Sequence, residues 1–109
     1  MGKSDHLGEF EQLALLAVMR LGDEAYGARI QEELEATAGR STAISSIYIT
    51  LTRLEGKGLV RSELGPPSPE RSGRARRYFR LEPEGVAALQ GARDQLLAMW
   101  AGLEERLET

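Results

Sequence analysis

The middle of the chain contains a stretch, residues 45–60, that reads SSIYITLTRLEGKGLV. Apolar side chains recur in it at intervals of three and four residues, which is the spacing of one face of an α-helix. Ser45 is a residue type that helix N-caps favour, and Gly58 is a residue type that often ends helices. The stretch therefore predicts a helix from about Ser46 to Lys57, with a change of backbone conformation at Gly58.

The predicted helix has two faces of different character. Ile47, Leu51 and Leu54 lie within about 60° of one another around the helix axis, so they are predicted to face the core. The opposite face has no acidic residue, because Glu55 falls nearer to the core edge. The outward face and its edges offer hydroxyl groups, one phenol, one aliphatic side chain and one guanidinium group: Ser45, Ser46, Tyr48, Ile49, Thr52 and Arg53.

Two more helices are predicted before this stretch. Residues Phe10–Leu21 are apolar on almost every side, which indicates a helix that is buried on more than one face. In residues Tyr26–Ala38 the apolar side chains recur at steps of four, opposite a glutamine and glutamates. A glycine follows each segment, Gly22 the first and Gly39 the second, and glycine is the usual residue at the end of a helix.

After the central helix, the sequence indicates a β-hairpin. Residues Leu59–Leu64 predict a short strand, and residues Tyr78–Leu81 predict a second strand that returns along it. Residues Gly65–Pro69 contain three prolines and a glycine, so they are predicted to be irregular. Residues Arg71–Arg77 are expected to continue this connection as a basic loop. The hairpin would therefore have a positively charged tip.

The charge of the chain is unevenly distributed. The formal net charge of the 109 residues is −3, which taken alone argues against a nucleic-acid partner. Residues 57–81, however, contain seven basic and two acidic side chains, and the segments before and after them are acidic. A cluster of arginines is often only a solvated loop. At the tip of a hairpin it also attracts phosphates without regard to sequence, and the candidates are Arg71, Arg74, Arg76 and Arg77.

A last helix is predicted to begin at Pro83, a residue type that suits the first turn, and to continue to about Glu108. One explanation of its apolar stripe is that it packs on its own domain. The length of the helix favours packing against a second copy of the chain. The stripe follows steps of three and four with one polar position: Val86, Leu89, Arg93, Leu96, Trp100, Leu103 and Leu107.

The order of these elements is that of a winged helix-turn-helix domain with a long helix after it. We expect a mainly α fold with a small β-hairpin. Residues 1–82 would form a winged helix DNA-binding domain, and residues 83–109 a C-terminal dimerisation helix. In such a domain the third helix enters the major groove of double-stranded DNA, and the wing reaches the backbone or the minor groove.

The residues of the outward face suit these contacts. Arg53 can pair with a phosphate or a guanine edge, and Ile49 can pack on a thymine methyl group. Ser45, Ser46 and Thr52 can donate hydrogen bonds to phosphates or base edges. An exposed isoleucine is also common on surfaces that have no role. The alternative function is a protein–protein interaction module whose wing meets an acidic partner, and the polar third helix argues against it.

Other classes of function have few candidate residues. The chain has no cysteine and one histidine, His6, and no glycine-rich segment ends as a phosphate-binding P-loop does. We therefore expect no enzyme, no cofactor and no metal. The longest apolar run, Leu13–Met19, is too short to span a bilayer, so we expect no membrane partner. The lack of cysteine fits a cytoplasmic protein.

Several motifs resemble those of the PadR family of bacterial transcriptional regulators. The resemblance covers about residues 7–90, and residues 48–60 are its most specific part. The last helix is similar in length and pattern only, as in the small subfamily with a single C-terminal helix. The motifs are LGEFEQL at residues 7–13, Ala25-Tyr26-Gly27, Ser46-Ile47-Tyr48 with Leu51, Arg53-Leu54-Glu55 before Lys57-Gly58-Leu59-Val60, and Tyr78–Leu81 before Pro83-Glu84-Gly85.

The resemblance implies a homodimeric repressor in which the last helix packs against the N-terminal helix of the partner, here through Leu13 and Leu16. It also implies that Tyr48 faces DNA and that the wing supplies basic contacts. Some PadR-like proteins bind flat aromatic compounds between the protomers through aromatic residues of the last helix. Trp100 is the candidate for contact with such a small aromatic effector, although we favour the simpler explanation that it fills the dimer core.

Overall fold

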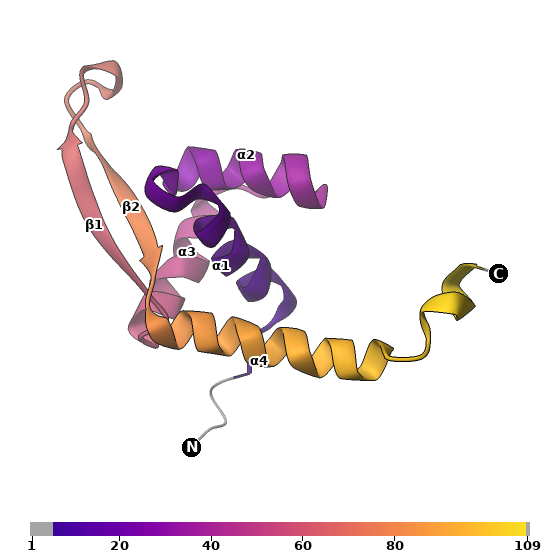
Figure 1. The fold of residues 1–109 in the computed structure, drawn as a ribbon. Helices are drawn as coiled ribbons and strands as arrows, with labels where there is room; N and C mark the ends of the chain where they lie inside the picture. Colours follow the sequence, from indigo (N-terminus) through magenta and orange to yellow (C-terminus); the bar gives the residue numbers. More distant parts are fainter. Residues whose placement is uncertain (1–5, 109) are drawn as a thin grey trace.

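The computed structural model describes residues 6–108, which form three helices, a two-stranded hairpin and a long final helix (Figure 1). The hairpin stands at one side of the helices, and α4 passes them and extends beyond α1. This arrangement confirms the predicted mainly α fold with a small β-hairpin. With η for a 3₁₀-helix, the elements are α1 (Glu9–Leu21), η2 (Gly22–Glu24), α2 (Gly27–Ala38), α3 (Ile44–Gly56), β1 (Val60–Pro67), η3 (Pro69–Arg71), β2 (Ala75–Leu81), α4 (Pro83–Trp100) and η4 (Glu104–Glu108).

The core lies where the first three helices meet the hairpin. Ile47, Leu51 and Leu54 of α3 are fully buried there, which confirms the predicted core face of this helix. Burial of large aliphatic and aromatic side chains from every layer is the main force that holds the helices against the hairpin. The largest fully buried side chains are Phe79, Leu15, Ile30, Ile47, Leu51, Leu54 and Val60.

The start of α3 differs from the prediction. The helix begins at Ile44 rather than Ser46, and its N-cap is Ala43 rather than Ser45. The carbonyl group of Ala43 accepts hydrogen bonds from the backbone N–H groups of Ser46 and Ile47, at 3.1 and 3.3 Å. Because backbone hydrogen bonds set this start, Ser45 does not cap the helix with its hydroxyl group. It lies in the first turn and is exposed.

The prediction that residues 65–69 are irregular was wrong in part, because β1 extends through Pro67 and only Ser68 and Pro69 lie outside it. The strands are antiparallel, and their register shifts between the pair Leu64↔Arg77 and the pair Pro67↔Ala75. Proline keeps an extended backbone and lacks only the N–H donor. In a sheet of two strands each strand is an edge strand, so a missing donor on its outer side is tolerated.

The prediction that residues 71–77 form a loop was also wrong in part. β2 begins at Ala75, so Arg76 and Arg77 belong to a strand, and only Arg71 and Arg74 lie in the connection. Pairing with Leu64 fixes the backbone of Arg77, whereas Arg76 lies in β2 at the point where the register shifts. The side chain of Arg77 therefore starts from a defined position.

The last helix is shorter than predicted. It ends at Trp100, well before Glu108. Ala101 leaves the helical conformation with a ψ of 126°, and Gly102 follows with a φ of +83°, a left-handed conformation that glycine adopts readily. Leu103 and Leu107 therefore do not continue the stripe on α4, and Leu107 lies in η4.

The stripe on α4 is divided between two environments. Leu89 is buried in the core of its own chain, and Val86 is half-buried. Further along, Leu96 and Trp100 are 53% and 41% exposed. The first part of the stripe thus packs on its own domain, and the C-terminal part remains uncovered in the single chain.

A glycine sets how closely α4 approaches the start of the hairpin. The backbone N–H of Glu82 donates a hydrogen bond of 3.0 Å to the carbonyl oxygen of Leu59. Gly85 lies over the same carbonyl group, and a Cβ atom there would fall well inside the 3.0 Å that real Cβ atoms keep. No helix within residues 6–108 has the length and apolar character that a membrane crossing requires.

Candidate nucleic-acid interface

The outward face of α3 is exposed and mostly polar. Ser45, Ser46 and Thr52 are exposed, and Ile49 in their midst is 63% exposed. Glu55 turns away from this face toward β1, where its carboxylate accepts hydrogen bonds from the backbone N–H and the hydroxyl of Ser62. The outward face of α3 therefore presents no carboxylate to an approaching polyanion.

Tyr48 lies at one edge of this face and is half-buried. Its ring packs against the ring of Phe79 in β2, with 5.9 Å between the ring centroids. It also lies against Gly27, the first residue of α2, where a Cβ atom would come within 2.9 Å of the phenol oxygen. Because Gly27 has no side chain, the phenol of Tyr48 can lie directly beside the N-terminus of α2.

Arg53 lies at the other edge, where α1 supplies a carboxylate. Arg53 Nε donates a hydrogen bond of 3.4 Å to Glu11, and Lys57 Nζ lies 3.8 Å from the same oxygen. The backbone N–H of Gly8 donates to Glu11 at 2.9 Å. Burial raises the pKa of Glu11, but the Gly8 hydrogen bond and the charges of Lys57 and Arg53 outweigh it and lower the pKa below its usual 4.5. Glu11 therefore stays ionised and holds Arg53 through Nε rather than through its terminal nitrogens.

The hairpin carries the predicted basic cluster in its outer part, and among residues 6–108 the hydrogen bonds of its members go to uncharged oxygens. Arg71 Nη1 donates to the carbonyl of Ala75, and Arg74 Nε donates to the carbonyl of Arg71. Arg77 Nη1 donates to the hydroxyl of Ser62 at 3.1 Å. We call the cluster the wing arginines: Arg71, Arg74, Arg76 and Arg77.

The wing arginines differ from the other positive side chains in whether a carboxylate lies close to them. Within residues 6–108, none of the wing arginines has a carboxylate within 4.0 Å. Every other lysine or arginine of residues 6–105 has one. The pairs are Arg20–Glu33, Arg29–Glu32, Arg40–Glu9, Arg53–Glu11, Lys57–Glu11, Arg61–Glu82, Arg80–Asp23 and Arg93–Asp94.

A pair of tyrosines joins the wing to the N-terminus of α2. Tyr26 is the N-cap residue of α2 and forms a β-bridge with Tyr78 of β2. The guanidinium carbon of Arg76 lies 4.3 Å from the centre of the Tyr26 ring. Because Gly27 follows Tyr26 and contacts Tyr48, the wing and the outward face of α3 meet at this helix end. Tyr48 of α3 and Arg76 of the wing thus both lie against the N-terminal end of α2.

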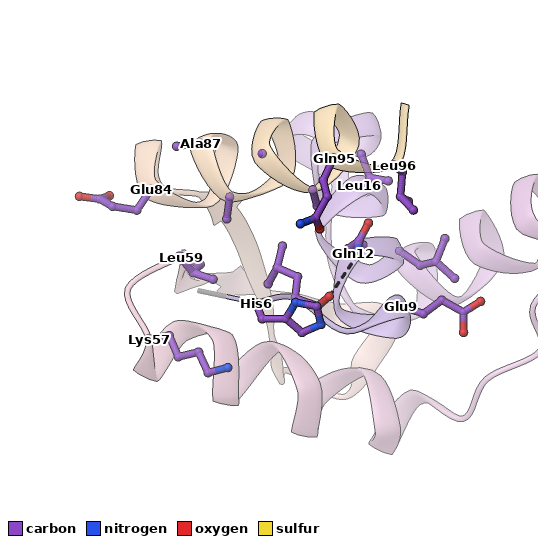
Figure 2. Close-up of a pocket in the computed structure, with 15 residues that line it drawn as sticks. His6, Glu9, Gln12, Leu16, Lys57, Leu59, Glu84, Ala87, Gln95 and Leu96 are labelled. Carbon is purple, nitrogen blue, oxygen red and sulfur yellow. Dashed lines mark hydrogen bonds between the residues drawn. The ribbon is translucent and has the colours of Figure 1, made fainter. Parts of the chain in front are cut away.

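A groove of about 950 Å³ lies on another part of the molecule, between α1, the end of α3 and α4 (Figure 2). The wall formed by α4 is built largely from small residues, among them Ala87 and Gly91. Leu13, Leu16 and Leu96 of the predicted dimer interface line the groove. Its open, partly apolar shape suits a helix rather than a small polar molecule.

Sequence reasoning missed two side chains of the interface. Tyr26 fits the apolar spacing of α2, but in the structure it is half-buried and the guanidinium of Arg76 lies over its ring. Glu11 gives no sign in the sequence that it pairs with Arg53, which is 42 residues away.

Comparison with known proteins agrees with this architecture. Residues 15–91 match the transcriptional regulator PadR-like family. No curated protein sequence matches the chain. The solved structure of a PadR family transcriptional regulator from Eggerthella lenta is similar, with 29% sequence identity and a TM-score of 0.67, and the match covers 93% of this chain and 88% of that one.

Two further solved structures share the fold. A PadR-like transcription factor from Bacteroides fragilis has 26% identity and a TM-score of 0.61, over 91% of this chain and 86% of that one. A PadR-like transcriptional regulator from Bacillus cereus has 19% identity and a TM-score of 0.71, over 92% of each chain. The family match spans well over half of the sequence. The chain therefore belongs to the PadR-like family of transcriptional regulators.

Proposed function

We propose that this protein is a sequence-specific DNA-binding repressor that acts as a homodimer, with α3 in the major groove and the wing on the backbone or in the minor groove. The observation that carries the proposal is the pairing of the positive charges. The wing arginines have no carboxylate within 4.0 Å among residues 6–108, whereas every other lysine or arginine of residues 6–105 has one. Guanidinium groups without a counter-ion bind phosphates strongly.

The outward face of α3 supports direct contact with bases. Ser45 and Ser46, in the first turn, are proposed to contact phosphates or base edges, and Thr52 base edges further along. Ile49 is proposed to pack on a thymine methyl group. At the two edges of the face, the phenol of Tyr48 and the guanidinium of Arg53 would contact the DNA strands that flank the groove. A protein-binding module would be expected to present a more apolar surface here.

The groove and the exposed part of α4 support the proposed dimer. We propose that the C-terminal half of α4 packs against the partner and that residues 83–109 serve dimerisation, while residues 1–82 bind DNA. Leu96 and Trp100 are exposed in the single chain, and so is Leu16 of α1, which lines the groove. A second copy would remove these apolar side chains from water, which is the usual driving force for such association.

Trp100 is the candidate for contact with an effector. It is the one tryptophan of the chain and lies at the end of α4. Filling the dimer core is the role that we favour for it. Binding of a flat aromatic compound between the protomers is the second proposed role, and quenching of its fluorescence by such a compound would distinguish the two.

Selection of bound sequences from a random pool of duplex DNA tests the proposed function. We expect a palindromic sequence whose half-sites are about one helical turn apart, because a twofold dimer reads twofold DNA. Binding at about 50 mM salt should weaken steeply as salt rises, with six to eight neutralised phosphates giving a slope of about −5 to −7. If no duplex DNA binds at low salt, DNA recognition is refuted, and a protein-binding module takes its place.

Paired variants locate the phosphate contacts. Replacing Arg74 and Arg77 by alanine removes two wing charges per protomer and should reduce the salt slope by about 3 to 4 for a dimer. Replacing Arg20 and Arg40 by alanine removes two charges that already have carboxylate partners, and should leave the slope unchanged. An equal effect of both variants would mean that the wing has no special role in binding.

A further inference from the structure

Arg76 differs from the other wing arginines in its surroundings. Its guanidinium carbon lies 4.3 Å from the centre of the Tyr26 ring, and no other wing arginine within residues 6–108 lies over an aromatic ring. Arg76 is half-buried, whereas Arg74 and Arg77 are exposed. The hydrogen bond with the side chain of Tyr78 raises the pKa of Arg76, and Tyr26 adds to this, so its charge is secure.

The Tyr26 ring is itself held firmly. The backbone of Tyr26 forms a β-bridge with Tyr78, and the N–H of Phe79 donates a hydrogen bond of 2.9 Å to the carbonyl of Ala25. The rings of Tyr26 and Tyr78 meet edge to face, with 5.4 Å between centroids. On the other side of Tyr78, a Cβ atom at Gly65 would come within 2.7 Å of its ring. Tyr78 therefore lies between Gly65 and Tyr26 and supports the ring on which Arg76 rests.

Stacking of this kind affects what an arginine can bind. A guanidinium group that lies flat on a ring keeps its N–H donors in its own plane, where they reach a phosphate without leaving the ring. Its conformational freedom is also lost before the DNA arrives, so less entropy is lost on binding. Arg74, which is bonded only to a nearby carbonyl in the connection, has no such support.

We propose that Tyr26 is a positioning residue for DNA binding, because it holds the guanidinium of Arg76 in place as a preformed phosphate contact beside the N-terminus of α2. Tyr78 and Gly65 keep the Tyr26 ring in this position. The inference rests on the proposed DNA-binding function. It assigns Arg76 a different energetic role from Arg74, although both carry the same charge in the same hairpin.

A double-mutant cycle tests the inference with the full chain and a fluorescently labelled duplex of mixed sequence at about 50 mM salt. The variants are Tyr26→Leu, Arg76→Ala and their combination, with Arg74→Ala alone and combined with Tyr26→Leu as the matched control. Arg76→Ala should weaken binding about tenfold per protomer, the loss of one phosphate contact at this salt. In the Tyr26→Leu background the same change should cost only about threefold, since the stacking advantage is already gone.

Arg74→Ala should weaken binding by the same factor in both backgrounds. Tyr26→Phe keeps the ring, so it should weaken binding less than Tyr26→Leu does and separate the role of the ring from that of the hydroxyl. An equal loss for Arg76→Ala with and without Tyr26 would overturn the inference. So would a Tyr26→Phe variant as weak as Tyr26→Leu. If neither Arg76→Ala nor Arg74→Ala weakens binding, the proposed role of the wing fails instead.

A second arm leaves Tyr26 in place, so it decides the question even if Tyr26→Leu does not fold. Arg76→Lys keeps the charge but loses the flat group that stacks, so binding should weaken about threefold while the salt slope is unchanged. Arg74→Lys keeps the charge of a side chain that has no ring beside it, so it should weaken binding less than Arg76→Lys does. Equal affinities for the two lysine variants would refute the positioning role.

Discussion

Replacing Gly85 by alanine should weaken the packing of α4 against the start of the hairpin. The added Cβ atom would overlap the carbonyl oxygen of Leu59, so the start of α4 must move by at least about 1 Å. Such overpacking costs about 1 to 3 kcal/mol, and the hydrogen bond from Glu82 to Leu59 contributes about 1 kcal/mol more. The higher helix propensity of alanine offsets about 1 kcal/mol of this loss of stability. We expect a net loss of about 2 kcal/mol.

Thermal unfolding at a fixed protein concentration measures this loss, because the melting temperature of a dimer depends on concentration. For a chain of this size the change should lower Tm by about 10 °C. Gly56→Ala is the matched control, since a Cβ atom at Gly56 meets open space and the residue ends α3 with an ordinary backbone. A Gly85→Ala variant that melts within about 2 °C of the unchanged protein would refute the close approach of α4 to Leu59.

Two further predictions concern the dimer and the acid stability. Leu96→Glu should convert the proposed dimer to a monomer of 12.0 kDa in light scattering, because it would bury an unpaired charge in the proposed interface. Gln90→Glu, an equal change at an exposed position outside the groove, should leave the dimer intact, and a dimeric Leu96→Glu variant would place the interface elsewhere. The lowered pKa of Glu11 stabilises the fold above its usual 4.5, and this contribution is lost as pH falls through the lower value in the folded state. Denaturant unfolding of Glu11→Gln should therefore show a weaker loss of stability below pH 4.5 than the unchanged protein, and identical acid profiles would exclude Glu11 as a contributor.

The helices and their buried faces followed from the sequence, because helical periodicity is a strong local signal. Ile47, Leu51 and Leu54 recur at the spacing of one helix face, and all three are fully buried. The end of the last helix did not follow. A heptad count treats Ala101 and Gly102 as two more positions, but their non-helical backbone leaves Leu103 outside the helix.

The hairpin shows a second reason for failure. Proline is a poor residue for the middle of a sheet, and this general rule predicted that Pro66 and Pro67 lie outside the strands. The rule depends on the number of neighbours, which is a tertiary property. With only two strands, β1 has an open side, and the prolines remain within it.

The candidate interface was predictable only in part, because some of its features are local in the sequence and others depend on tertiary contacts. The composition of α3 and the clustering of arginines are local properties, and they indicated both surfaces. The contacts of Arg53 with Glu11 and of Arg76 with Tyr26 join segments that are distant in sequence. The fold therefore decides which arginines have a carboxylate partner. The positions of the charged residues in the sequence do not show this.

In the proposed function, the position of the cations that lack a carboxylate partner should also set the side from which DNA approaches the protein. Within residues 6–105, the cations that lack a carboxylate partner all lie in the hairpin, and the whole chain has a net charge of −3. If the protein binds DNA as proposed, a duplex should be attracted to the hairpin more than to the other faces, so productive collisions should begin at the wing. Salt should therefore slow association more than it speeds dissociation, and the net charge of −3 serves to orient the encounter rather than to oppose it.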